Sequence, residues 1–313
     1  MSFSLAIHGG AGTRRRGTLS PEAEAEYRQG LRGALLAGHR VLADGGSALD
    51  AVTAAVMALE DDPQFNAGRG SVYTEAGTHE MDAAVMESEE RRAGAVAGIM
   101  GPRNPVLAAR AVMERSDNVL LIGEGALAFC RAQGLAFEEA AYFHTERRRA
   151  ALEAELERLR LAGKDMRDDA DRHGTVGAVA RDANGRLAAA TSTGGMTAKT
   201  PGRVGDCPVI GAGTWADEHC AVSATGHGEY FIRYAVAHEI ASRMRHAGEA
   251  LAAAAEGVVA ELGENGGSGG LIAVDASGET VLPFNGEGMY RGRIGPDGVA
   301  WTGIYREPLV ATG

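Results

Sequence analysis

The sequence predicts a mixed α/β fold of the α+β type, in which antiparallel pairing prevails over a doubly wound parallel sheet. The first observation is Asn184-Gly185 between two apolar runs, a strong short-range signal for a β-hairpin. The second is a similar pattern around Ser277-Gly278. The third is that helical and strand patterns occur in both halves of the chain, so neither half is all-α or all-β.

Capping and stop signals define the helices of the first half. Ser20 is a favourable N-cap residue and Pro21 suits the first helical position. Ser47 with Asp50 resembles a capping box, and Pro63 ends the helix that follows. The expected elements are, in order, strand 3–7, helix 22–42, helix 47–59, strands 80–87 and 93–100, a helix from Asn104-Pro105, strand 119–122 and a helix from about residue 125.

The composition changes sharply between residues 137 and 173. A charged helical pattern is followed there by an acidic stretch with Asp168, Asp169 and Asp171. Such a segment is normally a solvated helix and linker, and the acidic run lacks the spacing of an EF-hand loop. Beyond it, the expected elements are strands 175–182 and 187–193, helices 229–246 and 247–262, and strands 271–275 and 280–283.

Length, charge and cysteine content restrict the class of protein. The chain has 313 residues and a formal net charge of −11, which argues against a general nucleic-acid binder because phosphate affinity needs clustered Lys and Arg. Cys130, Cys207 and Cys220 show no paired spacing. Neither an 18-residue apolar run nor a signal-peptide pattern is recognised. We therefore expect a cytoplasmic enzyme with no nucleic-acid or membrane partner.

The chain has 45 glycines among its 313 residues, a fraction about twice the usual ~7 %. They form clusters that resemble known motifs. The turn at 8–12 follows a strand, as a phosphate-binding loop would, but lacks the Gly-Lys-Ser/Thr ending. Residues 266–270 match the nucleophile elbow G-x-S-x-G, yet a helix precedes them and a strand follows. Ser268 is therefore expected in a structural turn. His238-Glu239 has no second histidine four residues on, which excludes a zinc-protease helix.

Thr175 lies where the charged linker meets a predicted strand, in the run His173-Gly174-Thr175-Val176. A hydroxyl group needs a base beside it to attack an amide, and an N-terminal threonine carries that base as its own α-amine, with a pKa of about 7.7–8.0. The chain would have to be cut before Thr175, and Gly174 would allow the close backbone approach that self-cleavage requires. A β-branched residue opening a strand is the plain structural alternative.

Eight sequence motifs in order resemble one family. They are Ile-His-Gly-Gly-Ala-Gly at 7–12, Phe-Asn-Ala-Gly at 65–68, His-Gly-Thr-Val-Gly-Ala-Val at 173–179, Thr-Ser-Thr-Gly-Gly-Met at 191–196, Pro-Gly-Arg-Val-Gly-Asp at 201–206, Thr-Gly-His-Gly-Glu at 225–229, Gly-Gly-Ser-Gly-Gly at 266–270 and the run from Asn285 to Tyr290. Together they are similar to the plant-type L-asparaginases, which are isoaspartyl peptidases of the N-terminal nucleophile hydrolase class.

The resemblance spans nearly the whole chain and implies one domain over 1–313, a four-layer αββα sandwich. It also implies autoproteolysis between Gly174 and Thr175. The products would be an α subunit of residues 1–174, with a flexible linker from about 139, and a β subunit of residues 175–313. Two such αβ units would form a homodimer.

Catalytic roles follow from the matching positions. The resemblance implies that Thr175 attacks a side-chain amide or a β-aspartyl peptide carbonyl, and that Thr193 hydrogen-bonds the nucleophile. Thr225 and Gly226 match an oxyanion hole, made of a hydroxyl and a backbone N–H.

Binding roles follow in the same way. Arg203 and Asp206 match the residues that hold the substrate's α-carboxylate and α-ammonium, and a planar guanidinium suits a carboxylate better than Lys would. Asn66 matches a residue that the α subunit contributes near the site. The expected substrates are the small molecules L-asparagine and β-aspartyl dipeptides.

The resemblance implies no organic cofactor but a possible structural sodium ion. Its ligands would be the backbone carbonyls of Glu60, Asp62, Phe65, Ala67 and Arg69, which leave no side-chain signature. Arg69 departs from the family, where an apolar residue is expected, and could change the rim of the pocket. His227 stands where some relatives carry Thr.

Two alternatives remain at this point. A glycosylasparaginase would use the same mechanism on glycosylated asparagine, but those enzymes resemble His-Asp-Thr at the cleavage point, whereas this chain has Gly174. A non-catalytic small-ligand-binding protein on the same fold would not need this set of five residues together: Thr175, Thr193, Arg203, Asp206 and Thr225.

Overall fold

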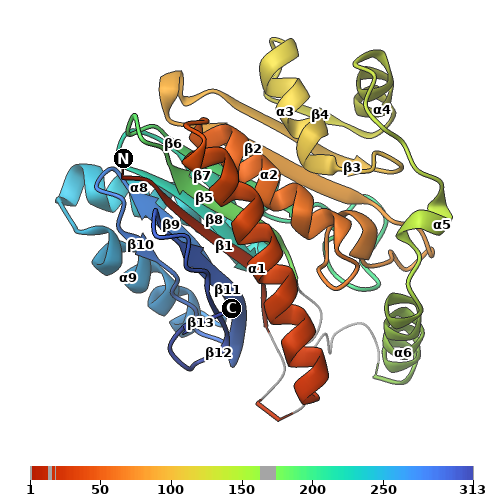
Figure 1. The fold of residues 1–313 in the computed structure, drawn as a ribbon. Helices are drawn as coiled ribbons and strands as arrows, with labels where there is room; N and C mark the ends of the chain where they lie inside the picture. Colours follow the sequence, from red (N-terminus) through yellow and green to blue (C-terminus); the bar gives the residue numbers. More distant parts are fainter. Residues whose placement is uncertain (1, 13–15, 18, 163–173, 313) are drawn as a thin grey trace.

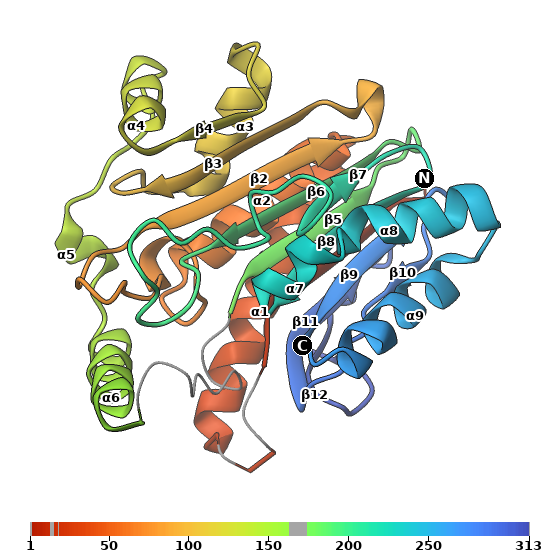
Figure 2. The ribbon, with the colours of Figure 1, turned by 180° about the vertical axis from the view of Figure 1, so that it is seen from behind.

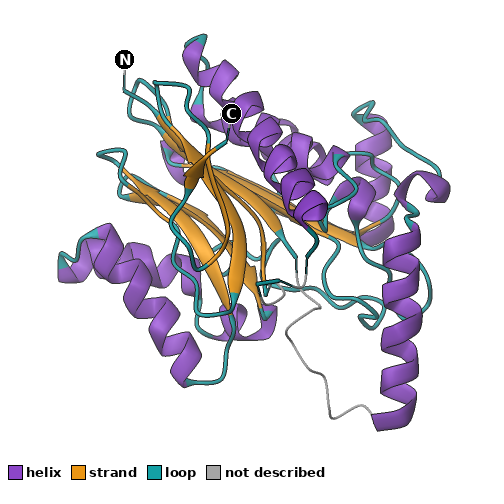
Figure 3. Ribbon diagram, turned by 60° about the horizontal axis from the view of Figure 1, so that its bottom comes forward, coloured by secondary structure: helices purple, strands orange, loops and turns teal. Residues whose placement is uncertain are grey.

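Two β-sheets face each other and helices cover the outer face of each, so the computed structural model has four layers in the order α, β, β, α (Figure 3). The structure describes residues 2–12, 16–17, 19–162 and 174–312. The predicted αββα sandwich, with helices and strands in both halves of the chain, is confirmed.

The larger sheet joins strands from both ends of the chain. Within the described residues its strands are β1 (Ser4–Ala11), β2 (Met81–Glu87), β3 (Ala93–Ile99), β4 (Leu120–Ile122), β5 (Val176–Arg181), β6 (Leu187–Thr193), β11 (Gly288–Ile294), β12 (Trp301–Tyr305) and β13 (Val310–Ala311). Their spatial order is β13-β12-β11-β1-β5-β6-β2-β3-β4. Neighbouring strands are antiparallel, except that β3 and β4 are parallel.

The smaller sheet comes from the C-terminal half alone. In the part of the chain that the structure describes, its strands are β7 (Thr214–Ala216), β8 (Cys220–Gly226), β9 (Gly269–Asp275) and β10 (Thr280–Val281), in the order β10-β9-β8-β7. All neighbouring pairs are antiparallel. The expected preference for hairpins over a doubly wound parallel sheet is therefore confirmed in both sheets.

Helices cover the two outer faces separately (Figures 1 and 2). On the larger sheet lie α1 (Pro21–Ala43), α2 (Ala48–Asp61), α3 (Pro105–Arg115) and α4 (Gly123–Ala132). On the smaller sheet lie α7 (Gly228–Arg233), α8 (Val236–Ser242) and α9 (Leu251–Glu264). None of the described helices is long and apolar enough to cross a membrane.

The sequence signals for the first two helices correspond to real caps. The Ser20 hydroxyl accepts a hydrogen bond from the Ala23 N–H at 3.2 Å, and Pro21 is the first residue of α1. The Ser47 hydroxyl accepts one from the Asp50 N–H at 3.1 Å at the start of α2. These bonds satisfy N–H groups that lack a partner inside the helix.

The space between the two sheets is filled mostly by small apolar side chains. Ala6, Val179 and Ala189 of the larger sheet belong to the same buried cluster as Ala221 and Ile272 of the smaller sheet. Close packing also admits polar groups at one place, because Gly177 has no side chain. A Cβ atom on Gly177 would lie 2.0 Å from the Ser223 Oγ and 2.5 Å from the His8 Nε2.

The prediction of one long helix over residues 229–246 is wrong. The structure divides it into α7 and α8 at Ala235, whose φ of 47° lies in the left-handed region, and ends it in a π-helical turn, Arg243–Ala247. The next helix, α9, begins at Leu251 rather than at residue 247. An apolar periodicity that continues across a break does not reveal the break, because one left-handed residue changes direction without changing composition.

The segment expected to link the two halves is helical over much of its length. It contains α5 (Ala140–Phe143) and α6 (Glu146–Ala162), and Phe143 and Leu152 are buried against the body of the protein. The predicted charged helix is therefore confirmed. Asp168, Asp169 and Asp171 lie outside the described residues.

Candidate active site

Thr175 lies directly before β5, a central strand of the larger sheet that pairs with β1 and β6. The Asn184-Gly185 hairpin pairs Val176 with Ser192, and the same register places Thr175 opposite Thr193. The two hydroxyl oxygens are 3.2 Å apart, with Thr175 as donor. The Gly195 N–H donates to the Thr193 hydroxyl at 2.9 Å. The structure therefore brings Thr175 and Thr193 together, as the sequence predicts.

Three backbone segments crowd around the peptide that precedes Thr175. A Cβ atom on Gly10 would lie 2.7 Å from the Gly174 Cα, and one on Gly174 would lie 3.1 Å from the Asn66 Cβ. The Asn66 amide donates to the Gly195 carbonyl at 2.7 Å and accepts from the Val72 N–H at 2.9 Å. Asn66 thus ties the loop after α2 to the turn after Thr193. A side chain at Gly10 would collide with the Gly174 backbone, and one at Gly174 would require a small shift of Asn66.

Thr225 and Gly226 are the last two residues of β8, on the smaller sheet. The Thr225 hydroxyl accepts a hydrogen bond from the Ala11 N–H at 3.1 Å, which joins the two sheets beside Gly10. Because its oxygen accepts there, its proton is available to another acceptor. Gly226 has a φ of +152°, and a Cβ atom there would lie 2.4 Å from the Ser268 carbonyl oxygen.

Arg203 and Asp206 form a second group in the loop between β6 and β7. The Arg203 guanidinium donates two hydrogen bonds to the Glu229 carboxylate, at 3.0 and 2.9 Å. Asp206 is buried, and its Oδ2 has no hydrogen-bond partner among the described residues. Gly228 lies between them, since a Cβ atom there would be 2.9 Å from the Asp206 Oδ1 and 3.0 Å from the Arg203 Nη2.

Burial controls the charge state of Asp206. Loss of solvent around the carboxyl raises its pKa to about 7, although the nearby Arg203 charge opposes this rise. An ammonium group that entered the site would give this carboxylate the partner it lacks. Arg203, by contrast, already has a carboxylate partner, and a bound carboxylate would share or replace Glu229.

His8 is a residue of the site to which the sequence analysis assigned no role. Its Nδ1 lies 2.9 Å from the Thr175 carbonyl oxygen, and its Nε2 lies 2.9 Å from the Ser223 Oγ. Because a carbonyl can only accept, Nδ1 carries the proton and Nε2 accepts from the Ser223 hydroxyl. Complete burial lowers the pKa of His8 to about 3, so the ring is neutral. The available signal was its place in the glycine cluster at 8–12, which was expected to be a turn but in the structure continues strand β1 to Ala11.

A family model described as asparaginase matches residues 1–304. The chain belongs to the asparaginase family of hydrolases. This chain is 53 % identical over 312 residues to the isoaspartyl peptidase of Salmonella typhimurium. The alignment covers 97 % of this chain and 98 % of that protein.

Two further relatives come from other organisms. The isoaspartyl peptidase of Escherichia coli is 50 % identical over 309 residues, with 97 % of this chain and 96 % of that protein covered. The plant-type L-asparaginase of Pyrococcus abyssi is 41 % identical over 295 residues, with 91 % and 94 % covered. The membership of this family that the sequence motifs predict is confirmed.

In this asparaginase-family enzyme, the two departures noted from sequence lie in different places. Arg69 is exposed, and its guanidinium lies over the Tyr142 ring, 5.5 Å from the centroid. The His227 Nε2 lies 3.3 Å from the Glu229 carboxylate, the same carboxylate that holds Arg203. Glu229 is therefore a second residue that the sequence analysis left without a role, although it stands in the quoted 225–229 motif.

The loop after α2 folds back tightly on its own backbone. A Cβ atom on Gly68 would lie 2.6 Å from the Glu60 carbonyl oxygen, and one on Gly70 would lie 2.0 Å from that of Phe65, so the loop folds tightly over these oxygens. In the described ranges, no group of three or more His, Cys, Asp or Glu residues could hold a metal ion. A cation bound at this loop would therefore depend on backbone oxygens.

Proposed function

We propose that this enzyme hydrolyses β-aspartyl dipeptides and L-asparagine, with Thr175 as an N-terminal nucleophile that autoproteolysis at Gly174-Thr175 releases. The observation that carries the proposal is the Thr175 hydroxyl, 3.2 Å from Thr193 and directly after a glycine enclosed by Gly10 and Asn66. The names of the similar proteins, isoaspartyl peptidase and plant-type L-asparaginase, support the same substrate class.

Processing would begin with the same hydroxyl that later attacks substrate. The Thr175 Oγ adds to the Gly174 carbonyl carbon, the peptide C–N bond breaks, and the nitrogen takes the proton. The result is an ester between Gly174 and Thr175. Water then cleaves the ester, leaving a Gly174 carboxylate and a free Thr175 α-amine. Crowding of Gly174 by Gly10 and Asn66 favours the compact geometry that this addition needs.

Substrate hydrolysis would then use the new α-amine as the base. It accepts the Thr175 hydroxyl proton while Oγ attacks the β-carbonyl carbon, and Thr193 helps to hold the hydroxyl in place. The Thr225 hydroxyl and the Gly226 N–H would stabilise the oxyanion. The leaving amine takes a proton and departs. Water hydrolyses the acyl-enzyme to release aspartate.

The two groups of the candidate site divide the work of substrate recognition. Arg203 would bind the α-carboxylate of the aspartyl part, and the buried Asp206 would bind its α-ammonium. Asn66 would hold the glycine turn around the nucleophile through its bond to Gly195. These interactions recognise the aspartyl half common to both proposed substrates.

We further propose a sodium ion on the carbonyl groups of Glu60, Asp62, Phe65, Ala67 and Arg69, with no organic cofactor. The cation would supply a fixed positive charge that orients these carbonyls. The resemblance of the Phe-Asn-Ala-Gly motif at 65–68 to the family supports this assignment. The loop in turn carries Asn66, whose side chain reaches Gly195.

Assembly and compartment are also part of the proposal. We propose that two αβ units form a homodimer and that the enzyme works in the cytoplasm. Cys130, Cys207 and Cys220 are all unpaired and buried, which suits a reducing environment.

The processing step can be tested on a denaturing gel. The wild-type protein should give two fragments, and the smaller should begin Thr-Val-Gly on N-terminal sequencing. Thr175→Ala should stay at full length and be inactive, because it lacks the attacking hydroxyl. Thr200→Ala, an exposed threonine in the same half, is the matched control and should be cut normally. A stable single chain with full amidase activity would contradict the mechanism.

The substrate class needs a direct comparison of three compounds. Hydrolysis of β-Asp-Leu, L-asparagine and glycosylated asparagine should be measured on the processed wild-type enzyme. We expect activity on the first two. A clear preference for glycosylated asparagine would instead favour the glycosylasparaginase alternative.

A further inference from the structure

A cavity of about 770 Å³ opens beside the proposed nucleophile and has no role so far. Gly10, Asn66 and Gly174, which surround the peptide before Thr175, line one part of it. Arg147 and Arg148 of α6 line another part. We refer to it as the arginine cavity. Arg203 and Asp206 are not among its described lining residues, so it is separate from the group proposed to bind the aspartyl half.

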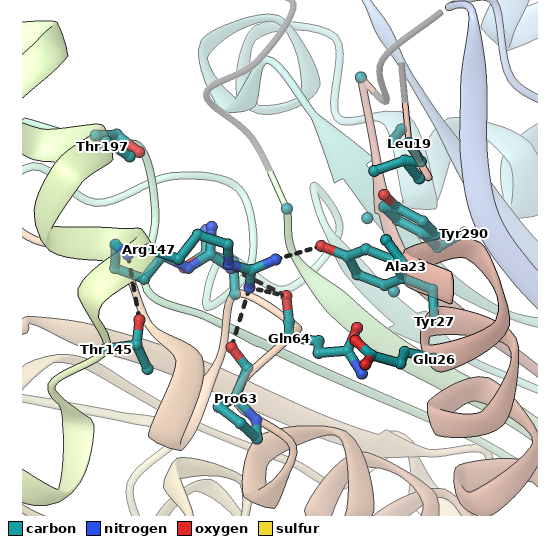
Figure 4. Close-up of a pocket in the computed structure, with 18 of the residues that line it drawn as sticks. Leu19, Ala23, Glu26, Tyr27, Pro63, Gln64, Thr145, Arg147, Thr197 and Tyr290 are labelled. Atoms are coloured by element: carbon teal, nitrogen blue, oxygen red, sulfur yellow. Dashed lines mark hydrogen bonds between the residues drawn. The ribbon is translucent and has the colours of Figure 1, made fainter. Parts of the chain in front are cut away.

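Both arginines are held by neutral oxygen atoms. Arg147 donates to the Tyr27 hydroxyl and to the carbonyls of Pro63 and Gln64, at 3.0 and 2.6 Å from the two carbonyls (Figure 4). Arg148 donates to the carbonyls of Gly70 and Gln64, at 2.7 and 3.3 Å. In the described part of the chain, neither guanidinium has a carboxylate within ion-pair distance. A guanidinium has five N–H donors, so each retains donors for another acceptor.

The two neighbouring guanidinium groups repel each other, although the Asp62 carboxylate attracts Arg147 and the Glu26 carboxylate lines the same cavity. The two cations are adjacent in the first turn of α6, the end of a helix that favours negative charge. Burial, together with the charge of Arg147, lowers the pKa of Arg148 to about 9. Negative charge placed in the cavity would relieve both effects.

The opposite wall of the cavity suits an apolar group. Leu19, Ala23 and Tyr27 line it, and the Tyr27 ring stacks on the Tyr290 ring with centroids 4.3 Å apart. Glu26 of α1 is an acidic residue of the same lining (Figure 4). A ligand with one carboxylate and an apolar side chain would complement the arginines and the aromatic wall, whereas an acidic side chain near Glu26 would be repelled.

We propose that the arginine cavity binds the leaving residue of a β-aspartyl dipeptide, with the free α-carboxylate of that residue on Arg147 and Arg148. The inference rests on the proposed function, since it assigns the second half of the same substrate. The scissile bond then lies at Thr175, between the aspartyl half at Arg203 and Asp206 and the leaving residue beside Gly174. L-Asparagine, which releases only ammonia, does not use the cavity.

The test compares a dipeptide that has the carboxylate with one that lacks it. The values of kcat/KM are measured for β-Asp-Leu, for its C-terminal amide and for L-asparagine. The processed wild-type enzyme should prefer the acid over the amide by about tenfold or more, the effect of a charge-assisted hydrogen bond. In Arg147→Gln and Arg148→Gln this acid-to-amide ratio should fall about tenfold toward one, and lysine at the same positions should restore part of it.

Arg149→Gln is the matched control, because Arg149 is on the same helix but does not line the arginine cavity and is paired with Glu153 at 2.7 Å. It should keep the wild-type ratio. Equal losses on the acid, the amide and L-asparagine would mean that the arginines only hold the loop carbonyls, and would overturn the proposal. An acid-to-amide ratio near one in the wild type would overturn it even if the glutamine variants were not processed. Absence of hydrolysis of all three compounds would instead count against the proposed function.

Discussion

Asp206 is a single residue whose surroundings predict a pH dependence of binding. Its pKa is raised to about 7 by burial, against the pull of Arg203, so the free enzyme loses the carboxylate as the pH falls through about 7. The ionised form is the one that can hold an ammonium group.

We therefore expect the inhibition constant of the product L-aspartate to increase up to about tenfold per pH unit below pH 7. Inhibition of the processed enzyme between pH 5.5 and 8.5 would measure this. Asp206→Asn should bind more weakly at high pH and show no such slope. An inhibition constant for the wild type that does not vary across this range would contradict the assignment.

His8 predicts a pH dependence of stability rather than of binding. The folded protein keeps the ring neutral down to about pH 3, whereas the unfolded chain takes up a proton near pH 6.5. The unfolded state therefore binds more protons between these values, and the free energy of unfolding should fall as the pH falls below 6.5. One such group contributes at most about 1.4 kcal/mol per pH unit.

Urea unfolding between pH 6.5 and 5.0 would measure this effect on the uncleaved Thr175→Ala background. His8→Asn should lower stability overall, because it loses the bonds to the Thr175 carbonyl and to Ser223, and should reduce the loss on acidification. His246→Asn, at an exposed position, is the control and should keep the parental slope. An unchanged slope in the His8 variant would show that other groups cause the acid sensitivity.

The junction between α7 and α8 depends on one strained residue. Ala235 has φ 47° and ψ 44°, a left-handed conformation that costs a side chain about 1–2 kcal/mol. Glycine adopts it without that cost, although it loses more entropy on folding.

Ala235→Gly should therefore increase the free energy of unfolding by up to about 1 kcal/mol. Ala237→Gly, inside α8, should decrease it by about 1 kcal/mol. Denaturant unfolding on the same Thr175→Ala background measures both, and a decrease for both would contradict the prediction.

The strand order of the larger sheet predicts that the two fragments stay together after cleavage. β1, from the segment before Gly174, lies between β11 and β5, which both follow Thr175. β6 in turn pairs with β2 of the first segment. The two fragments therefore share one continuous sheet, and cleavage of one peptide bond removes none of its pairings.

We expect the two fragments to elute together in size-exclusion chromatography without denaturant, and to separate only in concentrated denaturant. Gel analysis of each fraction would show this. Dissociation of the fragments in native buffer would mean that the shared sheet does not hold them together.

Features that depend on neighbours along the chain could be predicted from the residues alone. Ser20, Ser47 and Asn184-Gly185 act within a few residues, so they predicted two helix starts and the hairpin that sets Thr175 opposite Thr193. The motifs also placed Asn66, Arg203 and Asp206 among the candidate residues. Strand β8 escaped prediction because it is buried on both faces and lacks alternation, and no turn signal marks it as Asn184-Gly185 marks the equally buried β6.

Which of these groups come into contact depends on the packing of the whole chain. His8 reaches Thr175 across 167 positions of sequence, and Ala11 reaches Thr225 across 214. Arg147 and Arg148, predicted only as part of a charged solvated helix, turn toward the cavity beside Gly174. Local signals could not show these contacts, because they arise from the order of strands and the packing of two sheets, which bring together residues that have no common pattern in the chain.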